Sequence, residues 1–267
     1  MTLTLAGITV YPVKSAAGIA LQEWEVDQFG LRYDRRWMVV DQAGEFLSQR
    51  SHPRMALVTT GILNGTLRLE APDMAALEIP LDPQPTVHTS VRVWKDRCGA
   101  TWMGERPARW FSDFLGTACN LVHMPDETLR PADPTYAPDG TRVSFADAFP
   151  FLIISEASLA DLNRQLAEPV PMNRFRPNLV IAGAEPYAED GWDRLEINGV
   201  RLRIVKPCAR CVVTTTDQST AVRSQEPLRT LGRYRKVWGK VMFGQNAVQE
   251  TVGRLHVGDP VLSSKSS

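Results

Sequence analysis

The sequence lacks the long apolar segments and the charge excess that mark membrane proteins and nucleic-acid-binding proteins. No apolar stretch approaches the roughly 20 residues that a helix needs to span a bilayer, and the longest lies near residues 149–154. The start of the chain has no basic segment followed by a long apolar run, so no signal peptide is expected. The 30 basic residues balance 30 acidic ones. A neutral chain has no overall attraction for nucleic acid or for anionic membranes, and neither is expected as a partner.

Cysteine is scarce, and this scarcity narrows the possible metal chemistry. The four cysteines are Cys98, Cys119, Cys208 and Cys211. Without an export signal, reduced thiols and a cytoplasmic location are expected. A structural zinc site needs four ligands. The single Cys-x-x-Cys pair has no second half-site and the four histidines lie singly along the chain, so no zinc is expected.

The sequence also lacks the motifs of a second redox centre. It contains neither a Gly-x-Gly-x-x-Gly dinucleotide fingerprint nor a flavin motif. The spacing Cys-x4-Cys-x2-Cys, typical of a plant-type iron–sulfur domain, is absent too. We therefore expect that any redox reaction draws its electrons from an external partner.

The hydrophobic pattern predicts a mainly β protein with several helices (α+β), built from two barrel-like modules. The predicted strands include a hairpin over 37–48 and the segments 67–70, 91–94, 178–183, 202–205, 212–216, 242–248 and 257–262. The predicted helices cover about 107–115, 155–168 and 227–234. Residues 130–141 contain three prolines and little apolar content. We assign them as a linker between an N-terminal domain (1–129) and a C-terminal domain (142–267).

Particular residues are expected to shape the helices and the core. Ser158 and Asp161 are expected to form a capping box at the start of the second helix. Trp192 and Trp238 are expected in the core rather than in catalysis. Three aromatic residues share one face of the first helix: Trp110, Phe111 and Phe114.

The most informative segment is Cys208-Ala209-Arg210-Cys211, which precedes a β-branched run. A thioredoxin-like dithiol opens a helix, whereas this run predicts a strand. Two buried cysteines acting as small hydrophobes are a second interpretation. Arg210 argues against it, because a cation is costly to bury without an anion. A soft transition metal is a further interpretation, since one thiolate suffices when a cofactor supplies the remaining ligands.

An ordered set of motifs resembles the MOSC family, which is named for the C-terminal part of molybdenum-cofactor sulfurases. The segments that resemble the MOSC domain are 173–178 (Asn-Arg-Phe-Arg-Pro-Asn), 187–192 (Tyr-Ala-Glu-Asp-Gly-Trp), 208–211, 214–217 (Thr-Thr-Thr-Asp) and 258–261 (Gly-Asp-Pro-Val). The segments that resemble the β-barrel domain preceding MOSC in one subfamily are 11–15 (Tyr-Pro-Val-Lys-Ser) with Gly18, 30–32 and 34–37. Together they cover nearly the whole chain.

The resemblance implies a molybdopterin cofactor whose molybdenum is ligated by one cysteine, the second of the pair, Cys211. Arg210 beside it would favour the thiolate and stabilise negative charge near the metal, whereas Cys208 is assigned to packing. The cofactor is a large anion and needs convergent cations, for which arginine offers paired hydrogen bonds. The further residues expected to contact it are Lys14, Ser15, Arg35, Arg36, Asp147, Ala148, Phe149, Arg176, Ala209 and Asn246.

The two-domain subfamily includes amidoxime-reducing components and bacterial reductases of N-hydroxylated bases. The resemblance therefore implies an oxidoreductase that reduces N-hydroxylated compounds. Because no second redox motif is present, we expect its electrons from a transient ferredoxin-like or other electron-transfer partner with its reductase. A non-catalytic carrier of the cofactor or its sulfur, and a dithiol redox protein, remain the alternatives. No pyridoxal phosphate is expected, because the sulfurases bind it in a separate domain for which this chain has no room.

Overall fold

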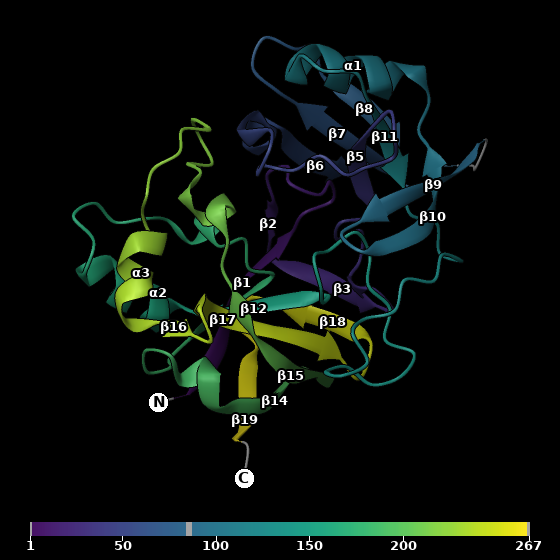
Figure 1. Ribbon diagram of the computed structural model, residues 1–267. Coiled ribbons are helices and arrows are strands. Elements are labelled where there is room, and N and C mark those ends of the chain that lie inside the picture. Colours follow the sequence, from purple (N-terminus) through teal and green to yellow (C-terminus); the bar gives the residue numbers. More distant parts are fainter. Residues whose placement is uncertain (1, 84–86, 266–267) are drawn as a thin grey trace.

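The computed structural model describes residues 2–83 and 87–265 (Figure 1). The protein is mostly β, with 42% of its residues in strands and 16% in helices, which confirms the predicted fold class. Two lobes lie side by side in Figure 1: a strand-rich barrel at the bottom and a smaller group of sheets around one helix at the top right. None of the described helices is both long and apolar enough to cross a bilayer.

A closed barrel of seven strands forms the first lobe. Its strands are, in order, β12 (Phe151–Ser155), β13 (Leu179–Ala182), β1 (Leu3–Val10), β19 (Pro260–Lys265), β14 (Trp192–Ile197), β15 (Val200–Ala209) and β17 (Lys240–Gln249). β17 pairs back onto β12 and closes the ring. Apolar side chains that point inward fill the barrel, including Phe151, Ile153, Leu195 and Leu202. Closure removes the free sheet edges that would otherwise expose unpaired backbone groups.

The start of the chain completes this barrel. β1 lies between β13 and β19, with Thr4 opposite Ala182 on one side and Pro260 on the other. A second sheet also joins distant parts of the chain, because β18 (Gly253–His256) pairs with β3 (Glu23–Asp27), and β3 pairs with β4 (Gly30–Leu31). A short strand, β2 (Ile19–Leu21), adds to β1. Two strands of the first 31 residues, β1 and β3, thus pair with strands on the far side of the predicted linker.

The second lobe holds two sheets and a helix. One sheet has the order β5 (Trp37–Asp41), β11 (Cys119–His123), β10 (Asp96–Trp102) and β9 (His88–Val93), and the other has β6 (Thr59–Leu63), β7 (Thr66–Glu70) and β8 (Leu77–Pro80). The helix α1 (Glu105–Leu115) buries Trp110, Phe111 and Phe114 against these sheets, which confirms the predicted helix face. The predicted hairpin is also present, because Leu47 N donates to Val39 O.

The helices α2 (Glu156–Arg164) and α3 (Leu228–Tyr234) flank the barrel together with β16 (Lys236–Val237). The capping box predicted at Ser158 and Asp161 is wrong. Ser155 is the N-cap, and its side chain accepts the backbone N–H of Ser158. Ser155 begins the helix because it satisfies an N–H that the first turn leaves unpaired. Asp161 instead accepts hydrogen bonds from Arg164 and Tyr187.

Three further expectations are wrong, each for a local reason. Residues 212–216 were predicted as a strand but form the 3₁₀ turn η4 (Val212–Thr215), because β15 ends at Ala209. The strand predicted over 257–262 is interrupted at Gly258, whose φ of 97° requires a glycine-like turn between β18 and β19. Trp238 is 87% exposed, whereas Trp192 is in the barrel core as predicted. The remaining 3₁₀ turns are η1 (Pro53–Leu57), η2 (Met172–Arg174) and η3 (Ala188–Gly191).

Candidate cofactor and active site

Cys211 lies where the barrel strand β15 becomes irregular. The pairing between β15 and β17 shifts register twice, between Ile204 and Lys206 and again between Pro207 and Ala209. Proline has no N–H to donate to a neighbouring strand, so it is tolerated at such bulges, and bulges re-aim the residues that follow. The chain then leaves the sheet, and Cys211 precedes η4 as its cap. Its thiol is free and half-buried.

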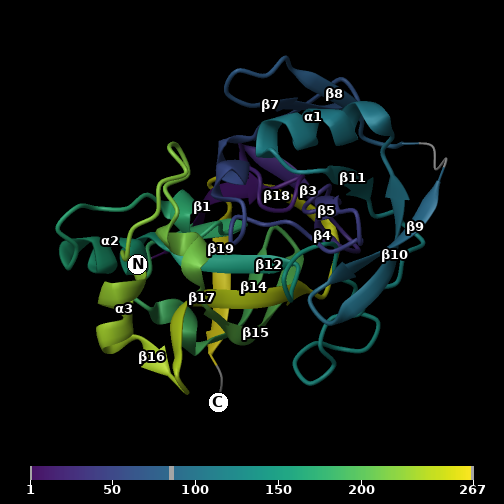
Figure 2. The same cartoon turned by 45° about the horizontal axis from the view of Figure 1, so that its top comes forward.

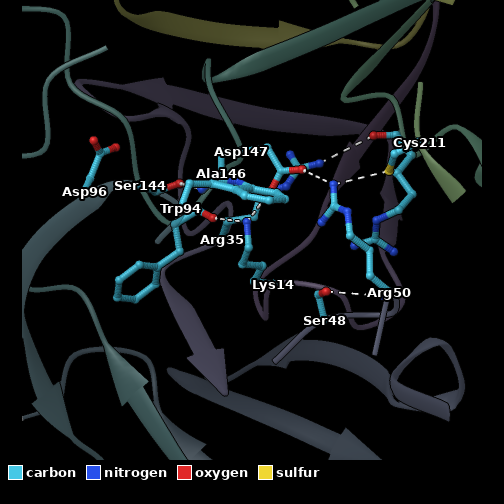
Figure 3. A network of polar contacts seen from close by, with 12 residues as sticks. Lys14, Arg35, Ser48, Arg50, Trp94, Asp96, Ser144, Ala146, Asp147 and Cys211 are labelled. Carbon is cyan, nitrogen blue, oxygen red and sulfur yellow. Dashed lines mark hydrogen bonds and ion pairs between the residues drawn. The ribbon is translucent and has the colours of Figure 1, made fainter. Parts of the chain in front are cut away.

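The Cys211 thiol faces an arginine from the other lobe. Arg50 Nη2 lies 3.2 Å from Cys211 Sγ and 3.1 Å from Asp147 Oδ2 (Figure 3). The guanidinium also stacks over the ring of Trp94, with its central carbon 4.5 Å from the ring centre. One cation therefore connects a nucleophilic sulfur, a carboxylate and an aromatic face, and it comes from a segment 161 residues away from Cys211 in the chain.

Asp147 is held by two cations. Lys14 Nζ donates to Asp147 Oδ1 at 2.5 Å (Figure 3). It also donates to the carbonyl of Phe145 at 2.7 Å. Burial raises the pKa of the Asp147 carboxyl, but Lys14 and Arg50 outweigh that effect and hold the pKa well below its usual range. Burial lowers the pKa of Lys14 to about 8, although Asp147 opposes the shift. The pair is thus an ionised carboxylate beside a lysine that has little contact with water.

A buried arginine fixes the loop that carries Asp147. Arg130 is 4% exposed and donates to the carbonyls of Ser144 and Ala146 at 2.6 and 2.7 Å. Its Nε also pairs with Asp96 at 3.1 Å. A hydrogen bond from a charged donor stabilises by about 1.5–3 kcal/mol, so this arginine holds the loop backbone in place behind the carboxylate.

A second group of cations lies around Tyr11. The guanidinium carbons of Arg35 and Arg176 lie 4.5 and 4.2 Å from the centre of the Tyr11 ring. Arg35 donates to Asp34 at 2.5 Å and to Asn178 at 2.9 Å. Burial lowers the pKa of Arg176 to about 10. An arginine whose charge is this costly to bury is suited to an anionic ligand.

Several residues of the site adopt a strained backbone. Ser15, Arg35, Trp94 and Arg176 have φ between 50° and 71°, in the left-handed region that side chains with a Cβ rarely adopt. Such conformations cost about 1–3 kcal/mol each and gather at ligand-binding sites. These four residues belong to the segments that hold Lys14, Tyr11 and Arg50, so part of this local strain lies at the candidate site.

Arg210 and Cys208 have contacts that differ from the expectation. Arg210 Nη1 donates to Cys208 Sγ at 2.9 Å, and Nη2 donates to the carbonyl of Phe175 at 2.6 Å. The cation on the Cys211 sulfur is Arg50. Cys208 packs at the edge of the cluster that contains Phe175 and Phe243.

The other residues predicted to contact the cofactor lie beside Lys14, after Asp147, and on β15 and β17, except Arg36. Ser15 follows Lys14, and its carbonyl accepts from Gln49 at 2.8 Å. Ala148 follows Asp147 at the surface, Phe149 is buried against Tyr136, and Ala209 ends β15. Asn246 lies on β17 and donates to the carbonyl of Lys206 at 3.2 Å. Arg36 is outside the group, since it donates to Met124 O and Asp126 and stacks over Phe29.

Sequence reasoning missed Arg50, Trp94 and Arg130. Arg50 follows the predicted hairpin, and no spacing connects it to Cys211. Trp94 ends a predicted strand, and nothing in the sequence indicates its left-handed φ. Arg130 falls in the predicted linker, whose composition indicates a loop and not a buried cation.

The donor set fits an anionic cofactor with a soft metal. Thiolate is a ligand for such metals, and the half-buried Cys211 thiol lies 3.2 Å from the Arg50 guanidinium of the other lobe. Among the described residues, Arg210 Nε and two nitrogens of Arg174 are buried without a hydrogen-bond partner. Buried donors without partners cost free energy, and an anion supplies the acceptors that they lack. In the part of the chain that the structure describes, no three His, Cys, Asp or Glu side chains gather as a metal site.

Comparisons with known proteins show the family of the chain. The MOSC N-terminal β-barrel domain model matches residues 2–118, and the MOSC domain model matches residues 140–262. The chain is 40% identical to human (Homo sapiens) mitochondrial amidoxime-reducing component 1, over 97% of this chain and 82% of the relative. It is 35% identical to the zebrafish (Danio rerio) molybdenum cofactor sulfurase, over 97% of this chain and 34% of the relative. It is 36% identical to human mitochondrial amidoxime reducing component 2, over 97% of this chain and 82% of the relative. The chain belongs to the family of proteins that join a MOSC N-terminal β-barrel domain to a MOSC domain.

Proposed function

We propose that the protein is a molybdenum-cofactor oxidoreductase that reduces N-hydroxylated compounds with electrons from an external partner. The observation that carries the proposal is the half-buried Cys211 thiol with the Arg50 guanidinium of the other lobe 3.2 Å from its sulfur. The human relative named for amidoxime reduction, 40% identical over 97% of the chain, supports the substrate class.

Two groups of residues would hold the cofactor, one at its phosphate and the other at its metal. Arg35 and Arg176, which flank Tyr11, would pair with the phosphate, because arginine binds phosphate through two parallel hydrogen bonds. Lys14 would add a point charge. Cys211 would be the protein ligand of the molybdenum, which supplies two-electron chemistry at the N–O bond when it is bound.

The residues beside Cys211 would orient the substrate. An amidoxime presents an N–OH group and amidine N–H groups. The Arg50 guanidinium would donate to the hydroxyl oxygen as negative charge develops on it. Asp147, which stays ionised because of its low pKa, would accept the N–H groups. Reduction consumes two electrons and two protons, breaks the N–O bond and releases water.

The test is metal analysis and turnover of two matched variants. Wild-type protein is expected to contain molybdenum and pterin and to reduce benzamidoxime with dithionite and methyl viologen. Cys211→Ser is expected to abolish both molybdenum content and turnover while the protein still folds, because a serine alkoxide is hardly available at neutral pH. Cys208→Ser is expected to be far milder. Equal loss in both variants, with a reversible disulfide in wild type, would support the dithiol alternative and refute the proposal.

One relative favours a second candidate function. The zebrafish protein named molybdenum cofactor sulfurase contains a region similar to 97% of this chain, although that region is 34% of its length. A non-catalytic carrier of the cofactor or its sulfur is therefore the competing candidate. Molybdenum-loaded protein that leaves benzamidoxime unreduced would identify it.

A further inference from the structure

The end of α3 and the β16–β17 turn expose three cations and a tryptophan. Arg233, Lys236 and Lys240 point into solvent and form no ion pair with another residue of 2–83 or 87–265. Trp238, at the turn between the two lysines, is 87% exposed. We call these four residues the hairpin patch. In both Figure 1 and Figure 2, α3 and β16 lie together on the side of the molecule away from α1.

The hairpin patch is a strong local excess of positive charge on a neutral chain. Residues 227–249 contain five basic side chains and no Asp or Glu. Two carboxylates border the patch, and both already pair with cations: Asp190 with Arg235 at 2.6 Å and Glu226 with Arg229 at 3.3 Å. The charges of the patch therefore remain available to an acidic partner.

The hairpin patch is connected through the backbone to the strand end that carries Cys211. Arg210 N donates to Val241 O at 2.7 Å, and Met242 N donates to Arg235 O at 2.8 Å. A single strand, β17, thus lies between β16 and the Cys208–Cys211 segment, and α3 also contacts η4. A protein that docks on the patch would lie beside the proposed metal site.

We infer that the hairpin patch is the docking surface for a small acidic electron-transfer protein. The inference rests on the proposed function, which requires two external electrons for each N–O bond. Trp238 would provide the apolar anchor, since exposed tryptophans are enriched at protein interfaces, and the three cations would steer an acidic partner. An anionic membrane surface is the less favoured occupant, because α3 has only seven residues and membrane-surface helices present a long apolar face.

The test compares two double charge reversals of equal net change. Lys236→Glu/Lys240→Glu alters the hairpin patch, whereas Arg106→Glu/Arg109→Glu alters two exposed cations of α1 in the other lobe. The assay is benzamidoxime reduction by the molybdenum-loaded protein, with an acidic plant-type ferredoxin and its reductase as donor. It is repeated at several salt concentrations and with dithionite and methyl viologen.

The hairpin variant is expected to raise the KM for ferredoxin by about 10-fold or more and to flatten its salt dependence. Its molybdenum content and dithionite-driven turnover should equal those of wild type. The α1 variant should stay within about twofold for every quantity. Unchanged ferredoxin kinetics in the hairpin variant, or a wild type that works with dithionite but not with ferredoxin, would overturn the inference. Loss of binding to anionic vesicles without a change in ferredoxin kinetics would overturn it too. A wild type that is inactive with dithionite would instead refute the proposed function, and the docking surface with it.

Discussion

Arg50→Gln should separate the chemistry of the site from its stability. The substitution removes the cation 3.2 Å from Cys211 Sγ and 3.1 Å from Asp147 Oδ2. Because the Asp147 side chain is 53% exposed, the ion pair contributes only about 0.2–1 kcal/mol, and stacking on Trp94 adds about 0.5–1 kcal/mol. We therefore expect a loss of about 1 kcal/mol in stability, or about 3 °C in Tm. Turnover should fall about 100-fold, the cost of losing one charged donor at a reacting group.

Arg54→Gln is the matched control for this prediction. Arg54 lies four residues further along the chain and stacks over Phe114 with its guanidinium carbon 4.6 Å from the ring centre. Its loss should lower Tm by a similar amount and leave turnover unchanged. The assay is dithionite-driven benzamidoxime reduction per bound molybdenum, with Tm from scanning calorimetry. Full turnover in Arg50→Gln, or an equal loss of turnover in Arg54→Gln, would refute the reasoning.

Three other expectations follow from the same contacts. Arg176→Ala should lower pterin content per chain while hardly changing the Tm of the apo-protein. Arg36→Ala should instead lower the Tm and leave pterin content unchanged, because Arg36 donates to Met124 O and Asp126. The reverse pattern would refute the assignment of Arg176, and not Arg36, to the cofactor site. Burial lowers the pKa of Lys14 from 10.5 to about 8, so the unfolded chain binds more protons than the folded apo-protein between these values. In denaturant titrations from pH 8 to 10.5, wild type should gain roughly 3 kcal/mol of stability relative to Lys14→Gln, and parallel curves would contradict this. The isolated chain should not reduce benzamidoxime with NADH alone, and activity without an added redox protein would reveal a centre that the sequence does not indicate.

Local patterns in the sequence predicted many elements correctly. Among the aromatic residues that predicted α1, Phe114 follows Trp110 by four positions and Phe111 by three, which places them on one face of a helix. The buried face of α1 therefore follows from the sequence directly. The apolar run before Ser155 predicted a strand for the same reason, and β12 is buried along its whole length. The segment Cys208-Ala209-Arg210-Cys211, with the ordered motifs on either side of it, indicated the family that the domain models confirm.

Other features depend on contacts between distant segments, and only the tertiary structure decided them. Residues 212–216 are β-branched, yet they turn into η4 because the register shifts of β15 end the strand before them. Trp238 is apolar, yet the β16–β17 turn places it in solvent. Local spacing carries no information about either outcome, because strand pairing is decided between segments far apart in the chain.

The sequence by itself determined the chemical groups of the site: a single Cys-x-x-Cys pair, a lysine and arginines in ordered motifs, and no second redox motif. Only the tertiary structure decided which cation meets which sulfur. Arg50 reaches Cys211 across 161 residues, and Arg210 turns to Cys208 instead. The physical reason is that the closed barrel takes its strand β1 from the start of the chain. This closure brings the N-terminal lobe against the end of β15, a contact that no pattern within either segment encodes.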